Sequence, residues 1–230
     1  MIQAVLDVET LGLPKKGETP EVLAIGVMLF DDMNAQFKKY FYRVLKPNGG
    51  CYDKSTKLWW LTQRTIVKQV AGIPIKPDEP ISFELPKDIK SEKYDISFQK
   101  VDASNALKDL VDFCTSNDVK RFWANSPTFD CRILEELCEA NKVMPPWYNN
   151  GKNEFWRQRD IRTIKDIYDQ FDLTKETYVF LKLALDDFRE MRISKLWYLK
   201  HFALYDCVAE ASMVCTTQEF LYKCQVVIEG

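Results

Sequence analysis

The sequence lacks the features that define several large classes of protein. It has no apolar run near the roughly 20 residues that cross a membrane, no basic leader before its first apolar segment, and no C-x-x-C pair among its seven cysteines. We therefore expect no membrane partner, no disulfide framework and no cysteine zinc site. The expected location is the cytoplasm, with the cysteines present as reduced thiols.

What the sequence does contain is typical of one globular domain. Its 230 residues are 46% apolar and 29% charged, which is enough to bury a core without disulfides or metals. We expect a single domain over residues 1–230 with a surface loop or insertion at about 73–102. That stretch is predicted to be a loop because it combines many charges with four prolines and shows no sustained hydrophobic period.

A basic and aromatic segment lies between residues 36 and 76. It holds nine lysines and arginines and one acidic residue, Asp53, although the whole chain has a formal net charge of −2. Tyrosines and tryptophans are interleaved with these cations, as in surfaces that neutralise phosphates and stack bases. A nucleic-acid-binding surface is one interpretation, and a solvated face over an ordinary core is the other.

Hydrophobic periodicity predicts an α/β fold. An apolar run at Ile2–Val8 is followed by two more strand-like runs, Glu21–Phe30 and Phe37–Leu45, so the chain is expected to open with an antiparallel meander of three strands. Short strands at Val119–Ala124 and Phe155–Asp160 would complete a mixed five-stranded sheet with helices on both faces. The predicted helices are Ser55–Val70, Ala103–Thr115, Thr128–Ala140, Ile164–Phe171 and Ala203–Tyr222, with irregular or short helical pieces at Leu181–Asp187 and Lys195–Leu199.

Two acids interrupt the end of the first strand. In an extended chain the side chains of Asp7 and Glu9 point to the same face, where a core strand would carry apolar residues. Two buried like charges about 7 Å apart are unfavourable unless something neutralises them. In proteins a bound divalent cation often does so. The alternative is a strand that has reached solvent and continues into an ordinary polar turn.

Two further acids, Asp130 and Asp206, could also either bind a cation or have an ordinary structural role. Asp130 falls in the first turn of an expected helix, shortly after a strand that ends near Asn125; an acid there stabilises a helix in any case. Asp206 opens the otherwise apolar last helix, where a buried acid is unfavourable without a partner. The single histidine, His201, lies five residues earlier, so both side chains could face one pocket. A lone histidine is nevertheless more often structural than catalytic.

Taken in order, these residues resemble the motifs of the DEDDh group of 3′–5′ exonucleases. The motifs are D-x-E on the first strand, N-x-x-x-F-D at a strand-to-helix turn and H-x-x-x-x-D at the start of the last helix. The resemblance covers nearly the whole chain and implies a ribonuclease H-like fold. All five catalytic positions of the group have a counterpart, namely Asp7, Glu9, Asp130, His201 and Asp206.

Two other stretches are more specifically similar to tailed-phage exonucleases of the DexA type. They are the pair Trp59-Trp60 after the third strand and the segment 156–163, which reads WRQRDIRT. This similarity implies a phage protein that works in the host cytoplasm. The chain departs from the family at Pro127, where a small flexible residue is more usual, and in the loop that begins near residue 73.

The resemblance implies a metal-dependent 3′–5′ exonuclease that releases 5′-mononucleotides, with single-stranded DNA as the expected substrate. Two divalent ions serve such chemistry, and carboxylate ligands suit Mg²⁺, with Mn²⁺ as a substitute. By resemblance, Asp7 contacts both ions, Glu9 and Asp206 hold the ion that carries the attacking water, Asp130 supports the other ion, and His201 is the general base. The alternatives are an exoribonuclease or oligoribonuclease of the same fold and, in another class, a nucleic-acid-binding module without turnover.

Further residues are predicted to contact the nucleic acid. Basic residues from Lys54 to Lys68 would make one side of a continuous helix cationic, while Trp59 and Trp60 would point about 100° apart, one inward and one towards the strand. The predicted substrate contacts are Thr10, Leu11, Asn125, Trp59, Trp60, Lys57, Arg64, Arg159 and Arg162. DNA and RNA, which differ by the 2′-hydroxyl, both stay open at this point, as does the oligomeric state.

Overall fold

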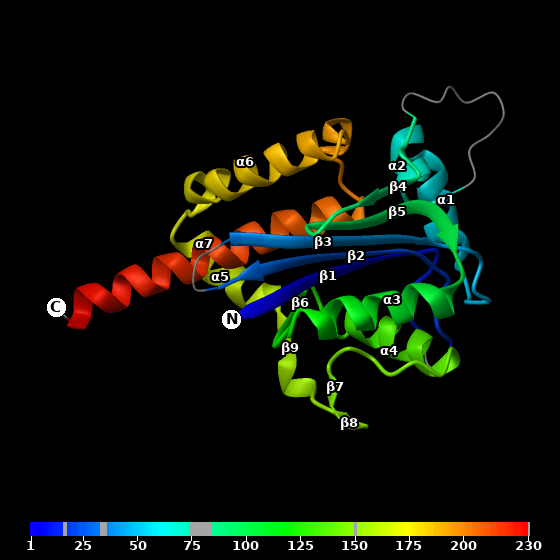
Figure 1. Ribbon diagram of the computed structural model, residues 1–230, viewed down its shortest axis with the longest axis horizontal. Coiled ribbons are helices and arrows are strands. Elements are labelled where there is room, and N and C mark those ends of the chain that lie inside the picture. Colours follow the sequence, from blue (N-terminus) through cyan, green and yellow to red (C-terminus); the bar gives the residue numbers. More distant parts are fainter. Residues whose placement is uncertain (16–17, 33–35, 74–83, 150, 230) are drawn as a thin grey trace.

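The computed structural model describes residues 1–15, 18–32, 36–73, 84–149 and 151–229 (Figure 1). In this part of the chain a mixed seven-stranded sheet runs in the order β4-β5-β3-β2-β1-β6-β9, and β7 pairs with β8 apart from it. The strands are β1 Ile2–Thr10, β2 Val22–Asp31, β3 Gln36–Leu45, β4 Asp88–Lys90, β5 Tyr94–Val101, β6 Arg121–Ala124, β7 Tyr148–Asn149, β8 Lys152–Asn153 and β9 Gln158–Asp160. The helices are α1 Lys54–Thr62, α2 Thr65–Val70, α3 Ala103–Ser116, α4 Asp130–Ala140, α5 Ile161–Gln170, α6 Thr174–Glu190 and α7 Ala203–Glu229.

Helices cover both faces of this sheet (Figure 1). α3 and α4 pack on one face, where Ala4 and Leu6 of β1 point into the core. α5, α6 and α7 pack on the other face, where Val5 of β1 and Met28 of β2 point into a second core. The side chains of β1 alternate between the two cores because successive residues of a strand face opposite sides.

The pairing of the strands confirms the predicted meander. β1 pairs with β2 and β2 with β3, both antiparallel. β6 then adds to β1 and β9 to β6, both parallel. The ends of β1 and β6 therefore meet at the same edge of the sheet, so that residues which follow these two strands lie close together.

The predicted number of five strands is wrong, because β4 and β5 extend the sheet beyond β3. Both lie in the stretch near 73–102 that was predicted to be a loop. The strand signal there is the alternation of Tyr94, Ile96 and Phe98, which pack against the core while charged and polar residues separate them. The prolines that precede this alternation led to the prediction of a loop. Residues 74–83 of the predicted loop lie outside the described part of the chain.

Three helix predictions also need correction. The helix predicted at Ser55–Val70 is two helices, because the backbone turns extended at Gln63 and Arg64. The piece at Leu181–Asp187 belongs to the 17-residue helix α6, whose buried residues include Phe180, Ala184 and Phe188 at helical spacing. α7 continues past Tyr222 to Glu229. Within the described ranges, none of the helices has the length and apolar character needed to cross a membrane.

One close approach brings α7 onto the sheet. Gly26 in β2 lies opposite Asp7 in β1, and a Cβ atom at position 26 would come within 2.6 Å of the carbonyl carbon of Ala203. Cys207 adds a contact from its thiol to the carbonyl oxygen of Gly26 at 3.3 Å. Because position 26 has no side chain, the first turn of α7 can lie beside the acids of β1.

We expect Gly26→Ala to destabilise the fold, since the added methyl group meets backbone atoms of Ala203 and Leu204 that cannot move independently of α7. The expected loss is about 1–3 kcal/mol of the free energy of unfolding, measured by urea denaturation. Gly12→Ala is the control, because its nearest neighbours would lie at 3.2 Å or more and the loss should be smaller. Equal midpoints for Gly26→Ala and the unmodified protein would contradict this account of the contact.

Candidate active site

β1 contributes two acids to the face that α7 covers. Glu9 is only 8% exposed, and Asp7 is partly exposed. Val5, two residues before Asp7, packs in the core beneath α7, while Leu6 and Val8 pack in the opposite core. The alternation along the strand therefore directs both carboxylates towards α7.

The turn after β6 delivers a third acid. The backbone N–H groups of Phe129 and Asp130 both donate to the carbonyl oxygen of Ser126, at 2.8 and 3.1 Å, and so form a tight turn into α4. Asp130, which is 4% exposed, accepts a hydrogen bond from the backbone N–H of Val8 at 3.4 Å. Pro127 lies within this turn and does not keep Asp130 away from β1.

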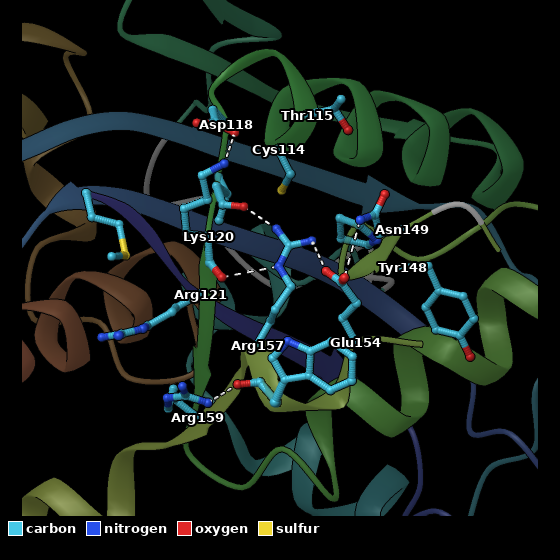
Figure 2. A pocket seen from close by; sticks show the side chains of 14 residues that line it. Cys114, Thr115, Asp118, Lys120, Arg121, Tyr148, Asn149, Glu154, Arg157 and Arg159 are labelled. Atoms are coloured by element: carbon cyan, nitrogen blue, oxygen red, sulfur yellow. Dashed lines mark hydrogen bonds and ion pairs between the residues drawn. The ribbon is translucent and has the colours of Figure 1, made fainter. Parts of the chain in front are cut away.

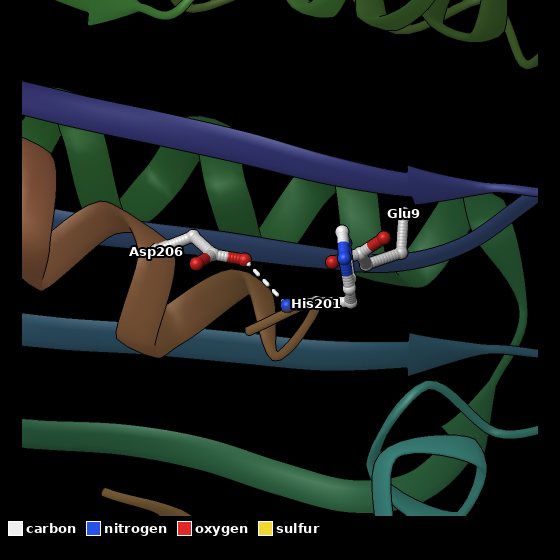
Figure 3. A group of neighbouring side chains, drawn as sticks. All are labelled: Glu9, His201 and Asp206. Carbon is white, nitrogen blue, oxygen red and sulfur yellow. Dashed lines mark hydrogen bonds between the residues drawn. The ribbon is translucent and has the colours of Figure 1, made fainter. Parts of the chain in front are cut away.

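The start of α7 supplies the remaining two predicted residues. The backbone N–H of His201 donates to Oδ2 of Asp206 at 2.8 Å, and His201 has a left-handed backbone with φ of +65°. Figure 3 shows the carboxylate of Glu9 beside the imidazole of His201, and the carboxylate of Asp206 on the other side, bonded to the backbone nitrogen of His201. Glu9, His201 and Asp206 each offer a ligand atom, and these atoms lie within 4.8 Å of one another. The structure thus brings all five predicted catalytic residues into one region.

Burial raises the pKa of every acid in this cluster. It raises the pKa of Asp206 to about 6 and that of Asp130 to about 7. The pKa of Glu9 rises to about 8, because repulsion from Asp206 and Asp130 adds to burial. Burial, followed by repulsion from Glu9 and Asp130, holds the pKa of Asp7 well above its ordinary value. Such a set of crowded oxygen ligands suits a divalent cation, which would relieve the repulsion.

The histidine is shifted in the opposite direction. Burial lowers the pKa of His201 below its ordinary value of 6.5, and the positive charge of Lys200 lowers it further. The imidazole is therefore neutral at pH 7, and one ring nitrogen is available to accept a proton.

The two adjacent tryptophans have different environments. Trp60 is 1% exposed and donates from its indole nitrogen to the carbonyl oxygen of Thr10 at 2.8 Å. Trp59 is 39% exposed, and its ring meets the imidazole of His201 edge-on with the centroids 4.6 Å apart. Leu11 follows Thr10 and bonds through its carbonyl to the N–H of Asp53 at 3.2 Å. One tryptophan thus packs inward, as predicted, and the other stays exposed beside the histidine.

The predicted continuous cationic helix side is not present. Lys57 on α1 is exposed and lies over the ring of Tyr52, 4.9 Å from its centroid. Arg64 is exposed but caps the separate helix α2, and Lys68 is 4% exposed. The break between α1 and α2 separates these charges, which the sequence pattern alone did not indicate.

The side chains of the two other predicted arginines bond to their own segment of the chain. Arg159 lines a cavity of about 710 Å³ together with Met1 and Arg121 (Figure 2). In the sheet Arg159 pairs with Trp123 of β6, but its guanidinium bonds back to the carbonyl oxygen of Gln158 at 2.9 Å, and none of the five predicted catalytic residues lines the cavity that it faces. Arg162 lies in the first turn of α5 and binds Asp160 through its side chain at 2.9 Å.

Glu210 is a fifth acid at this site that the sequence reasoning missed. It follows Asp206 by one helical turn on α7, and burial and the charges of Asp130 and Asp206 hold its pKa well above the ordinary value. The amide of Asn125, an exposed residue, donates a hydrogen bond to its carboxylate. The available signal was the i, i+4 spacing from Asp206 on an apolar helix.

The raised pKa values predict how the metal-free protein responds to pH. From about pH 4 to pH 8 the folded protein binds more protons at these acids than the unfolded chain does, so stability is lost as the pH rises through this window. In the presence of a chelator we expect a lower melting temperature at about pH 8.5 than at about pH 5.5. Asp7→Asn should reduce this difference, because it removes one of the repelling charges. Glu219→Gln, which changes an exposed acid paired with Lys223, should not; a melting temperature that rises with pH would refute the prediction.

Comparisons with known proteins identify the fold and the family of this chain. One similar solved structure is the nuclease domain of 3′hExo, a DEDDh family member, bound to rAMP. Its sequence is 12% identical, its TM-score is 0.51, and the alignment covers 95% of this chain and 92% of that chain. A structure of the 3′-end specific recognition of histone mRNA stem-loop by 3′-exonuclease is also 12% identical, with a TM-score of 0.47 over 96% and 82% of the two chains. No curated protein sequence matches the chain.

The first of these likenesses shows that the fold is the predicted ribonuclease H-like α/β fold. A family model described as the 3′-5′ exoribonuclease Rv2179c-like domain matches residues 3–217, nearly the whole chain. The protein is therefore a 3′–5′ exonuclease and belongs to the family of the 3′-5′ exoribonuclease Rv2179c-like domain.

Proposed function

We propose that this exonuclease removes 5′-mononucleotides from the 3′ end of single-stranded RNA, with divalent cations held by Asp7, Glu9, Asp130 and Asp206. The observation that carries the proposal is the convergence of these four carboxylates with His201 from β1, α4 and α7. RNA is favoured over the DNA expected from the sequence because the matching family model is an exoribonuclease domain. DNA is the second candidate.

The four carboxylates fit a pair of divalent cations. They are hard oxygen ligands, they are crowded, and burial raises the pKa of each. When bound, two such cations supply an activated water and stabilise the leaving oxygen of the phosphodiester. Mg²⁺ is the proposed ion, with Mn²⁺ as a substitute. The closeness to phage enzymes of the DexA type stays a prediction.

We assign His201 the role of general base. Its imidazole is neutral near pH 7 because burial lowers its pKa, so a ring nitrogen can take a proton from the attacking water. Asp206 holds the backbone of His201 through the 2.8 Å hydrogen bond, and Trp59 contacts the ring from the side. These two contacts would keep the imidazole in one orientation at the opening of the site.

Trp59 supports the proposed preference for an unpaired 3′ end. A base stacked on an exposed indole gains about 1–3 kcal/mol, and the gain depends little on which base it is. Trp59 is exposed beside His201, and Lys57, two residues earlier on α1, is also exposed. We therefore propose single-stranded substrates with little base selectivity.

Matched RNA and DNA oligonucleotides labelled at the 5′ end test this function. In Mg²⁺ we expect the RNA to shorten stepwise from its 3′ end and faster than the DNA. A chelator should stop the reaction, added Mg²⁺ or Mn²⁺ should restore it, and Asp7→Asn should be inactive because one cation ligand is lost. Full activity of Asp7→Asn, or cleavage in the chelator, would contradict the cation sites; faster cleavage of DNA would reverse the substrate assignment.

The role of His201 has its own test. His201→Ala should lower kcat by about 10²–10⁴-fold with little change in KM, because the change removes proton transfer and no substrate binding. The unmodified enzyme should lose activity as the pH falls through the pKa of His201, which lies below 6.5, and this acidic limb should be absent from the variant. A pH–rate profile with an unaltered acidic limb would show that His201 is not the base.

A further inference from the structure

Glu210 lies in the same region as the four predicted metal ligands, but nothing in the catalytic motif accounts for it. On α7 it follows Asp206 by four residues, so the two side chains lie on one face of the helix, one above the other. Its charge raises the pKa of Asp7, and the charges of Asp130 and Asp206 raise its own. The spacing from Asp206 and the shielding of Oε2 from solvent place its carboxylate on the side of the acids.

The hydrogen bonding of Glu210 is incomplete. Its carboxylate accepts a hydrogen bond from the amide of Asn125, yet Oε2 is shielded from solvent and has no hydrogen-bond partner. An ionised carboxylate oxygen can only accept a hydrogen bond, and burying it without a donor is unfavourable. Val208 and Ala211, its near neighbours in sequence, are fully buried, so the fold alone would favour an uncharged residue at position 210.

Within the described part of the chain, no basic side chain forms an ion pair that compensates this charge. Among the ion pairs formed by the described residues, none includes Glu210, and the nearby charges that act on it are the like charges of Asp130 and Asp206. Asn125 is neutral, so it holds one oxygen in place without cancelling the charge. A buried carboxylate held in this way has its remaining oxygen available for a cation or for a water bound to one.

We propose that Glu210 is a positioning residue of the nuclease site: held by Asn125, it adds a fifth carboxylate that strengthens the binding of divalent cations by Asp7, Glu9, Asp130 and Asp206. The inference rests on the proposed metal dependence. It assigns Glu210 no contact with the substrate and no proton transfer. Its effect is on cation affinity, so high cation concentration should compensate for its loss.

The test measures Mn²⁺ binding to the chelator-treated 230-residue chain by titration calorimetry. Glu210→Gln has nearly the same shape and can still accept the hydrogen bond from Asn125, but it has no charge. We expect Mn²⁺ to bind this variant about 10-fold or more weakly, and the metal-free variant to melt at a higher temperature because repulsion is reduced. Glu219→Gln, on the exposed part of the same helix, should match the unmodified protein in both measurements.

Activity gives a second readout. For Glu210→Gln the Mn²⁺ concentration that gives half-maximal rate should rise by a factor similar to the change in affinity, while the rate at saturating Mn²⁺ approaches that of the unmodified enzyme. Glu210→Asp, which keeps the charge on a shorter side chain, should fall between the two and provides the measurement if Glu210→Gln does not fold.

The outcomes separate this inference from the proposed function. If the unmodified protein binds Mn²⁺ and Glu210→Gln binds it within about twofold, a difference too small for a group that supports a metal ligand, Glu210 is structural and the inference is wrong while the proposed function stands. If the unmodified protein binds no Mn²⁺, the proposed function is wrong and the inference is wrong with it.

Discussion

Repulsion among crowded carboxylates is the constraint on which the rest of this structure depends. Asp7, Glu9, Asp130, Asp206 and Glu210 raise one another's pKa values or have them raised by burial. The groups that bind these acids directly are mostly neutral donors: the N–H of Val8 for Asp130, the N–H of His201 for Asp206 and the amide of Asn125 for Glu210. Neutral donors fix the positions of the acids but leave their charge uncompensated, which is what a cation site requires.

The surrounding fold holds this unfavourable cluster together through a few close contacts. Gly26 lets the first turn of α7 lie against β2, directly across from Asp7. The indole N–H of Trp60 bonds to the carbonyl oxygen of Thr10, which ties α1 to the end of β1. The same tie brings Trp59 to His201. Each contact uses the rigid core elements to position a group at the edge of the sheet.

Three acids of the site were predictable because each contradicts its local pattern. Asp7 and Glu9 stand where a core strand should be apolar, and Asp206 stands at the start of an apolar helix. The meander of β1, β2 and β3 was predictable because long strands show a clear apolar run. β5 was not predictable, because several prolines precede it and its alternation of apolar and polar residues begins only at Tyr94.

Other parts of the site depend on tertiary contacts that a linear pattern does not contain. The break between α1 and α2 at Gln63 and Arg64 follows from the packing of Trp60 and Val67 into the core, and it disperses charges that a continuous helix would align. The environment of Glu210 depends on the packing of α7 beside Asn125, which the sequence pattern does not contain. Arg159 pairs with Trp123 in the sheet, but its side chain turns back to the cavity lined by Met1 and Arg121, a direction that the strand pattern does not specify.

The left-handed backbone of His201 has a consequence for protein engineering. A residue with a side chain at φ of +65° is disfavoured by about 1–2 kcal/mol relative to a right-handed conformation, whereas glycine is not. A selection for thermal tolerance alone would therefore favour glycine at position 201 and remove the imidazole in the same step. If His201 is the general base proposed above, thermal stability and catalytic turnover favour different residues at position 201.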